Sequence, residues 1–505
     1  CKMINPIDKY FAKVTRYHVF FFAIFFLSKF PSIWHTLNII FLSPPMKYTC
    51  DDDLTGRTVN ASISLSDDDP VCPCDYPVWD YSMFTKTVQT KFNLICGDLW
   101  LISFSESMSF FGLLVGAVVF GILSDRYGRL ISFAICELIV GVSGCFVAVM
   151  PTMALFIIMR FFEGIGCGGA IVTGFVLCME NCGPKYRATI SSLLHIPSNL
   201  GLVALAGISY MIRDCDEFQL AISVPVLAFV FTRCLLLESP KWLLDRDKEK
   251  TIKAMESNNK PTEAVRADIE LYHATRTEPA KLKFYYIFKY KSHTKNFFCM
   301  AYCYFVCGMC YYGVSQFIGK MSPEVHKSTA YNGLLVASGT TSCIFIINRV
   351  GRRPYLRSTM LLAGIFMFIV VSVPKKYKHS LFRVICACLS SSFFYMSFII
   401  IFLYGVELFP TSIRNSVLGM LSLSSRIGQI LGPQINALSS TLAGAVFGIS
   451  AIIAAGLTFL LPETRGIELP STLEESVTVI PTRVQISNSV PKSDVKQPGA
   501  TATNT

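Results

Sequence analysis

The chain has 505 residues, of which 52% are hydrophobic and only 16% are charged, and its mean hydropathy is +0.48. A soluble domain carries about 25% charged residues, and a disordered chain has few aromatic residues, whereas this chain contains 40 Phe. These values exclude disorder and nucleic-acid binding as leading classes and indicate a polytopic membrane protein. The net charge of +11 is typical of proteins whose cytoplasmic loops are rich in Lys and Arg.

A helix needs about 20 mainly apolar residues to cross a bilayer, and the sequence contains twelve stretches of this kind. In chain order they cover residues 17–42, 100–123, 130–150, 153–178, 189–212, 218–237, 296–317, 328–347, 355–373, 380–403, 413–438 and 442–461. The sequence therefore predicts an all-α membrane protein with twelve transmembrane helices.

Basic residues lie mainly on one side of these spans. Residues 241–295, between the sixth and seventh spans, contain 13 Lys and Arg against 8 Asp and Glu. Smaller basic clusters on the same side lie at 9–16, 126–129, 185–187 and 349–357. Because Lys and Arg are concentrated in cytoplasmic loops, this side and both termini are predicted to be cytoplasmic, although residues 375–383 on the opposite side are also basic. The Ser-, Thr-, Val- and Pro-rich residues 466–505 predict a disordered cytoplasmic tail.

The loop between the first two spans, residues 43–99, is then predicted to lie outside the cell. It contains Cys50, Cys72, Cys74 and Cys96, which suggest two disulfides in one of three pairings. The triplet that begins at Asn60, Asn-Ala-Ser, is an N-glycosylation sequon. The loop is therefore predicted to be disulfide-bonded and glycosylated.

Three motifs recur in the same order at an offset of about 225 residues. The matched pairs are 125–129 with 348–353, Glu180 and Arg187 with Glu407 and Arg414, and Glu238 with Glu463. Each pair follows the corresponding span of the first and second six. The chain is therefore predicted to have two six-helix halves, residues 1–240 and 296–465, joined by a cytoplasmic linker at 241–295.

Two six-helix halves around a central axis are the architecture of a transporter that alternates access. The repeated charges lie at cytoplasmic helix ends, where we expect them to pair across the halves and hold the inner gate shut. The alternative is that they only anchor helix ends. The predicted gating residues are Asp125, Arg126, Gly128, Arg129, Glu180, Arg187, Arg349, Arg352, Glu407, Arg414 and Glu463.

The motif at 121–129, Gly-Ile-Leu-Ser-Asp-Arg-Tyr-Gly-Arg, resembles the signature of the major facilitator superfamily between spans two and three. More narrowly, the chain is similar to the family of organic cation, anion and zwitterion transporters, and residues 29–42 look most like its invertebrate branch. The motifs that carry this resemblance are 179–187, 238–243, 407–415 and 461–466. The resemblance covers about residues 10–475 and implies the major facilitator fold in a multi-pass protein of the plasma membrane. Asn348 departs from it, because an acidic residue is usual there, and the second-half gate is expected to be weaker.

Ionisable groups inside a membrane span cost several kcal/mol and are therefore functional candidates. Arg426 in the eleventh span is the first candidate, because a guanidinium attracts a carboxylate and repels a cation. The resemblance implies an Arg at this position in anion- and carnitine-type carriers. The alternative is that Arg426 pairs with a carboxylate of the protein. Thr340 stands where anion carriers of the family tend to have a second lysine, which favours a zwitterion or a monoanion over a dianion.

The resemblance also places two tyrosines at the central cavity, and these correspond to Tyr311 and Tyr312. Their rings can cover an apolar or cationic group and their hydroxyls can donate to a carboxylate. Gln316 lies one turn further along the same span and is a third candidate. Ordinary helix packing is the alternative interpretation of the tyrosines.

Two carboxylates, Glu106 and Glu137, lie in spans two and three. Either can bind a cationic head group, carry a proton, or pair with a buried arginine such as Arg160. Glu163 and Arg160 are interpreted as a structural pair near the inner end of span four. His35 makes the first span unusually polar and is a further candidate for the cavity.

The sequence thus predicts a secondary active or facilitative transporter of small organic ions, either a zwitterion such as carnitine or an organic anion, that functions as a monomer. An organic cation carrier and a transporter-like receptor that does not turn over are the alternatives. The sequence has no P-loop pattern, nucleophile–base pair or His-Glu-x-x-His spacing, so neither ATP-driven transport nor enzymatic activity is expected. The cysteines within 299–310 are interpreted as packing residues. No metal or cofactor is therefore predicted, and the expected partners are the organic ion and the lipid bilayer rather than nucleic acid.

Overall fold

The computed structural model describes most of the chain. The described residues are 15–50, 77–252, 262–275 and 287–465, apart from 184–185, 187–189, 192, 245, 247–248, 250, 289, 323, 348, 375–380 and 411–412. The predicted disordered tail at 466–505 lies outside them, as do Asn60, Cys72, Cys74 and Arg187.

The N-terminal half is built from helices that follow the first six predicted spans. They are α2 (Arg16–Leu37), α3 (Ile39–Leu42), α5 (Trp100–Tyr127), α6 (Arg129–Val149), α7 (Met153–Glu180), α9 (His195–Met211), α10 (Cys215–Ser223), the 3-10 helix η2 (Val224–Phe231) and α11 (Thr232–Leu235). The sixth span changes from α to 3-10 geometry where Pro225 enters it, because proline lacks the N–H that an α-helix needs at that position.

The C-terminal half follows the last six predicted spans. Its helices are α15 (Lys291–Met321), α16 (Val325–Ile346), α17 (Arg352–Ser372), α18 (Leu381–Leu408), α19 (Arg414–Ile435), α20 (Ser440–Leu457) and the 3-10 helix η5 (Thr458–Leu460). Each of the twelve predicted spans coincides with a helical segment, so the predicted all-α fold is confirmed. Nine of the described helical segments are long and apolar enough to cross a bilayer, and the more polar or shorter α9, α16 and α19 complete the set.

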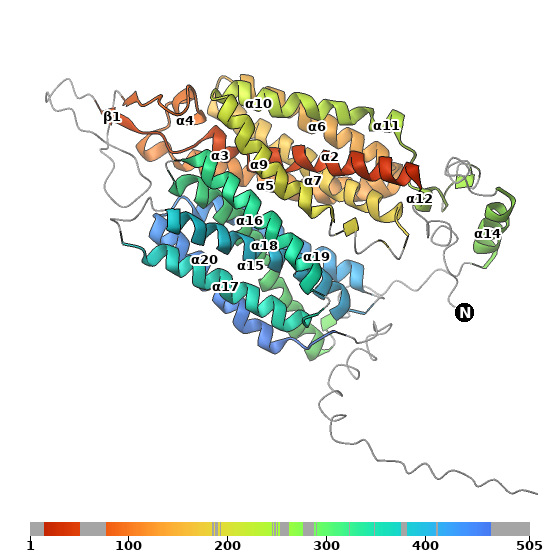
Figure 1. Ribbon diagram of the computed structural model, residues 1–505. Coiled ribbons are helices and arrows are strands. Elements are labelled where there is room, and N and C mark those ends of the chain that lie inside the picture. The colour runs from red at the N-terminus through yellow and green to blue at the C-terminus, as the bar shows by residue number, and fades with distance from the viewer. Residues whose placement is uncertain are drawn as a thin grey trace, which may run out of the picture.

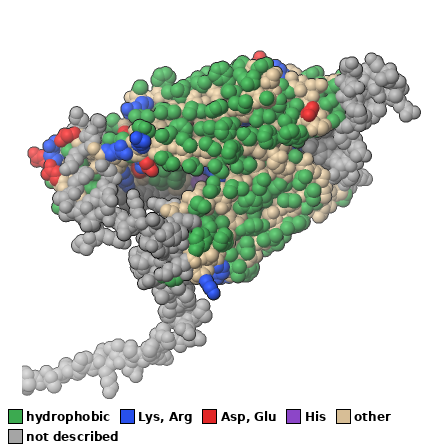
Figure 2. Space-filling view, turned by 180° about the vertical axis from the view of Figure 1, so that it is seen from behind, with side chains coloured by type: hydrophobic (Ala, Val, Ile, Leu, Met, Phe, Trp, Pro, Cys, Tyr) green, Lys and Arg blue, Asp and Glu red, His purple; other side chains and the backbone are tan. Residues whose placement is uncertain are grey.

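The two halves lie side by side as two bundles (Figure 1). One end of the molecule, which we call the loop end, carries β1 (Tyr48–Cys50), β2 (Pro77–Trp79), α4 (Val88–Lys91) and the 3-10 helix η1 (Cys96–Asp98). The opposite end, which we call the linker end, carries α12 (Pro240–Leu244) and α14 (Thr262–Thr275). Figure 2 shows a broad apolar surface across both bundles, with charged side chains gathered toward the ends. This distribution suits a protein whose sides face lipid.

The loop end is tied to the N-terminal half by polar contacts. β1 and β2 pair antiparallel, with Tyr48 opposite Trp79. Asp216 of α10 accepts hydrogen bonds from Lys86 and from Lys91, the latter at 2.7 Å. Cys96 is disulfide-bonded, and the two-disulfide arrangement expected for this loop stays a prediction.

The residues of the internal sequence repeat form matching structures at the linker end of the two halves. The Glu238 carboxylate accepts hydrogen bonds from the backbone N–H groups of Arg129 and Leu130, at 2.9 and 3.0 Å, at the start of α6. Glu463 does the same at the start of α17, where it accepts from the backbone N–H of Arg352 at 2.8 Å. A carboxylate is favourable at a helix N-terminus, where N–H groups lack intrahelical partners. The Glu238–Glu463 match in the sequence therefore reflects two equivalent helix caps.

Gly128 is the residue that lets the Glu238 cap approach α6. Its backbone has φ +118° and ψ 150°, a region that is essentially restricted to glycine. A Cβ atom at Gly128 would lie 2.6 Å from the Glu238 Oε2 atom. The glycine is required both by the backbone conformation and by the close carboxylate.

We expect Gly128→Ala to lower the free energy of unfolding by about 1–3 kcal/mol, because it combines strained backbone with a clash against the cap. Thermal unfolding of the detergent-purified protein measures the loss. Gly121→Ala is the matched control, since a Cβ at Gly121 of α5 would meet nothing within 4 Å and alanine favours a helix. Equal melting temperatures for the two variants would contradict this account of Gly128.

Candidate functional site

The two halves contact each other from the middle of the molecule to the loop end. The Asn199 side chain of α9 donates to the Thr340 hydroxyl of α16 at 2.9 Å. Nearer the loop end, the Ser209 hydroxyl lies 3.2 Å from the His326 imidazole Nε2. Between α5 and α19, the Ser107 hydroxyl donates to the Ile430 carbonyl at 2.7 Å. These contacts close the space between the halves at the loop end.

His326 forms the aromatic part of this closure. Its ring stacks on Phe41 at 5.4 Å and on Phe84 at 5.1 Å between ring centroids, and Tyr210 meets it edge-on at 5.7 Å. His326 belongs to the C-terminal half, whereas the three other rings belong to the N-terminal half. The seal at the loop end is therefore partly a ring stack across the two halves.

At the linker end, the described ion pairs stay within each half. Arg129 pairs with Asp125 at 2.8 Å and with Glu180 at 3.1 Å, and Arg352 pairs with Glu407 at 3.0 Å. The expectation that these charges pair across the halves is not met in this conformation. Figure 2 shows the surface hollowed between the halves toward this end. The structure is closed at the loop end and open at the linker end, so a gate made of cross-half pairs is not assembled.

Three other predicted gating residues, Arg126, Arg349 and Arg414, lie at the same end, and the contacts described for them stay within one half. The Arg126 guanidinium stacks over the Tyr127 ring at 5.4 Å. The Arg349 carbonyl accepts a hydrogen bond from Arg465 at 2.5 Å. Arg414 donates to the Phe409 carbonyl at 3.1 Å. Their roles in gating stay predictions.

A group of aromatic residues surrounds the middle of α15. The Tyr311 and Tyr312 rings are 4.9 Å apart, and Tyr311 lies 4.7 Å from Tyr395 of α18. Across the halves, Tyr312 meets Phe110 of α5 at 5.1 Å, and the Tyr395 hydroxyl lies 3.0 Å from the imidazole Nδ1 of His195. The two tyrosines predicted for the cavity therefore lie where the two halves meet.

Arg426 of α19 lies beside these rings and interacts electrostatically with Tyr312. Its Nη1 donates to the Gln429 side chain at 3.0 Å. No carboxylate of the described residues lies within 4 Å of the Arg426 guanidinium. The alternative in which Arg426 pairs with a protein carboxylate is therefore not seen in the described part of the chain.

The predicted candidates Glu106 and His35 lie elsewhere, in a buried cluster of the N-terminal half that we call the Arg160 cluster. Its ionisable members are Glu106, Arg160, Glu163 and His35, each at most 1% exposed. Arg160 forms ion pairs with Glu106 and with Glu163, the latter at 2.9 Å, and His35 contacts Glu163. Glu106 thus has the arginine partner that the sequence left open, and Arg160–Glu163 is one pair of a larger network.

Neutral side chains complete this network. Arg160 donates to the Asn38 side-chain oxygen at 2.7 Å, and Gln219 donates to Glu163 at 3.0 Å. Gln316 of α15 donates to Glu106 at 3.1 Å. The predicted cavity residue Gln316 therefore binds the Arg160 cluster across the two halves instead of lying with the tyrosines.

Glu137 of α6 is a separate buried carboxylate, 2% exposed. It interacts electrostatically with Lys29 of α2, and its Oε1 has no hydrogen-bond partner among the described residues. The pair lies within the N-terminal half.

Three residues of the central region escaped the sequence analysis. They are Phe110, Gln429 and Lys320. Gln429 follows Arg426 by three residues, so it lies on the same helix face, and this spacing was a usable signal. Phe110 and Lys320 carried no such signal, because only side-chain contacts across the halves place them, Phe110 with Tyr312 and Lys320 with Glu106.

The profile of the Major Facilitator Superfamily matches residues 94–433. Rat solute carrier family 22 member 3 is 29% identical over 415 residues, which cover 80% of this chain and 74% of the rat protein. Human solute carrier family 22 member 2 is 27% identical over 441 residues, which cover 85% of this chain and 77% of the human protein.

The fold is that of a solved transporter. The inward-open xylose transporter XylE from E. coli is similar with a TM-score of 0.68 and 17% sequence identity, over 91% of this chain and 99% of that chain. The relatives are transporters and not enzymes. The chain therefore belongs to the major facilitator superfamily and is related to the solute carrier family 22 transporters.

Proposed function

We propose that the chain transports a small organic ion that carries a carboxylate, either a zwitterion of the carnitine type or a monoanion, by alternating access. The observation that carries this proposal is Arg426, a half-buried guanidinium in a membrane span that has no carboxylate partner among the described residues. Since an unpaired charge inside a membrane is costly, a substrate carboxylate is a fitting partner.

The surroundings of Arg426 support the same substrate class. Gln429 has its Nε2 without a hydrogen-bond partner in the described part of the chain, so it can donate to the second oxygen of a carboxylate. Tyr312 and Phe110 offer ring faces for the apolar or methylated part of the substrate. A small ion between these groups would touch both halves, as alternating access requires.

The open linker end supports an inward-facing conformation, if this end is cytoplasmic as the basic residues predict. The side chains of Glu106 and His35 bind other residues of the Arg160 cluster. We therefore assign the substrate contacts to Arg426, Gln429, Tyr312 and Phe110. The proposal includes location in the plasma membrane, a substrate of the carnitine type and membership of the invertebrate branch.

We expect Arg426→Gln to reduce uptake of the carboxylate substrate about 10- to 100-fold, because a charged hydrogen bond contributes about 1.5–3 kcal/mol. Uptake of carnitine, benzoate and tetraethylammonium into oocytes tests it, with surface protein measured in the same cells. Arg357→Gln is the matched control, since the Arg357 guanidinium stacks on Phe459 at 4.4 Å, at the linker end and outside the central region.

Two results would contradict the substrate assignment. Uptake of tetraethylammonium that survives Arg426→Gln would identify a cation carrier. Absence of uptake and of exchange for the whole panel at normal surface density would favour the receptor that does not turn over.

The Asp125–Arg129–Glu180 triad should control the rate of the conformational change. We expect Asp125→Asn to lower the maximal transport rate several-fold at unchanged surface density, because the 2.8 Å pair with Arg129 is lost. Initial-rate uptake over a range of substrate concentrations measures this effect. Asp98→Asn, at the exposed opposite end of the same span, is the control. A loss of surface protein without a change in rate per molecule would show an anchoring role only.

A further inference from the structure

The Arg160 cluster contains more carboxylates than permanent cations. Glu106 and Glu163 face one guanidinium, that of Arg160, and all three side chains are fully buried. With His35 neutral, these groups leave one uncompensated negative charge in the N-terminal half. Because such a buried charge costs several kcal/mol, this half on its own favours the uptake of one positive charge.

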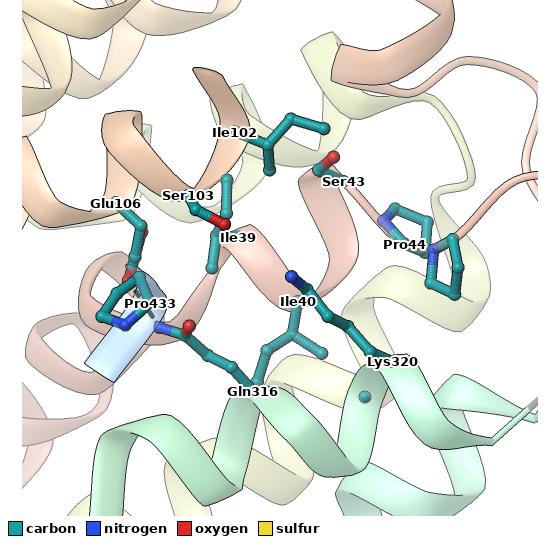
Figure 3. Close-up of a pocket in the computed structure, with 12 residues that line it drawn as sticks. Ile39, Ile40, Ser43, Pro44, Ile102, Ser103, Glu106, Gln316, Lys320 and Pro433 are labelled. Atoms are coloured by element: carbon teal, nitrogen blue, oxygen red, sulfur yellow. Dashed lines mark hydrogen bonds between the residues drawn. The ribbon is translucent and has the colours of Figure 1, made fainter. Parts of the chain in front are cut away.

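Lys320 of the C-terminal half compensates this charge in the closed loop end. Lys320 and Glu106 border the same small cavity of about 20 Å³, together with Gln316, and the Lys320 ammonium interacts electrostatically with the Glu106 carboxylate. Figure 3 shows the three side chains around this cavity, with Ser43 and Pro44 on its other side. With α15 docked in this way, two carboxylates and two permanent cations are balanced.

His35 lies beside Glu163 in the cluster. Its Nδ1 contacts the Glu163 carboxylate, and its Nε2 lies 3.3 Å from the Ile222 carbonyl oxygen. Both ring nitrogens therefore face acceptors.

Glu106 connects the cluster to the cavity at the loop end. The charged groups that face it are Arg160 and Glu163 of α7 and Lys320 of α15. From α3 and α19 the cavity is lined by uncharged residues, among them Ile40 and Pro433. The cavity has room for about one water molecule, which is enough to pass a proton to the Glu106 carboxylate.

We propose that the Arg160 cluster is a proton-binding site that couples substrate transport to an inward proton gradient, an inference that rests on the proposed function. When the halves part at the loop end, Lys320 and Gln316 leave with α15, and the cluster accepts one proton from external water through Glu106. When α15 docks again, Lys320 balances the cluster and the proton is released. Because the loop end is then closed, the proton passes to water on the linker side, and no other bond changes.

The chemistry of the cluster fits a proton and not a metal cation such as Na⁺. Arg160 and Gln316 donate N–H hydrogen bonds to Glu106, and the Lys320 ammonium, which donates to the Asn436 carbonyl at 3.4 Å, adds a positive charge nearby. A metal cation needs several oxygen ligands, whereas these donors repel it or cannot ligate it.

Purified full-length protein in proteoliposomes tests the inference. Carnitine uptake is measured with an inside-alkaline pH gradient and without it, with the membrane potential clamped by potassium and valinomycin in Na⁺-free buffer. Exchange of labelled carnitine across the membrane at equal pH normalises each variant. We expect the gradient to stimulate wild-type uptake at least threefold over its value without a gradient.

Three variants separate coupling from folding. Glu106→Gln removes one of the two carboxylates, so Arg160 alone balances the other and the cluster no longer needs a proton. The pH gradient should then no longer stimulate uptake. Lys320→Gln removes the group that displaces the proton, so the external pH of half-maximal stimulation should rise. Glu217→Gln, an exposed carboxylate at the loop end of α10, should behave like wild type.

The outcomes are distinct. Wild-type exchange without stimulation by the pH gradient overturns the proton inference and leaves the proposed function standing, as does stimulation by a Na⁺ gradient alone. Wild-type protein that exchanges none of carnitine, benzoate and tetraethylammonium overturns the proposed function itself. If Glu106→Gln does not fold, an unchanged pH response of Lys320→Gln is sufficient to reject the inference.

Discussion

The burial of one guanidinium, that of Arg160, determines how the helices of the N-terminal half meet. A buried arginine keeps its charge and its five donors, so acceptors must surround it. Glu106 of α5 and Glu163 of α7 supply carboxylates, and Asn38, between α2 and α3, supplies an amide oxygen. Gln219 of α10 then secures Glu163. Losing any one of these acceptors would leave a buried N–H donor of Arg160 without its partner, and this requirement holds four segments of the half at defined positions.

The ion pair between Glu106 and Arg160 needs α5 and α7 to lie unusually close, and glycines make this approach available. Gly112 and Gly116 of α5 face α7, while Gly164 and Gly168 of α7 face α5, and a Cβ atom at any of the four would lie 2.0–2.1 Å from a carbonyl oxygen of the other helix. Small residues four apart allow such contact between membrane helices. The glycine faces and the buried charges therefore work together, because the close approach of α5 and α7 brings Glu106 into contact with Arg160. The C-terminal half uses the same device at Gly308 and Gly428, between α15 and α19.

The sequence predicted the helices from apolar runs and the repeat from short motifs, because both kinds of signal involve residues close together in the chain. Apolar runs indicated all twelve spans, and the Glu238–Glu463 match pointed to equivalent positions that the structure shows as helix caps. Partners across long distances in the chain were not predictable in this way. Glu106 had several candidate partners, and only the packing of α5 on α7 selects Arg160. The linker-end charges were expected to pair across the halves, and they pair within them because this conformation is open at that end.

Arg160 and Arg426 show how the same residue type serves two purposes in one membrane protein. Arg160 donates through Nη1 and Nη2 to acceptors of its own half, so its charge is balanced before any substrate arrives. Arg426 has a neutral amide and the Tyr312 ring beside it, and under the proposed function a substrate carboxylate balances its charge. Because an uncompensated charge in a membrane is costly, the surroundings of Arg426 favour the binding of an anionic group where the halves meet. The two arginines differ in their partners, and this difference is why we propose a structural role for Arg160 and a substrate-binding role for Arg426.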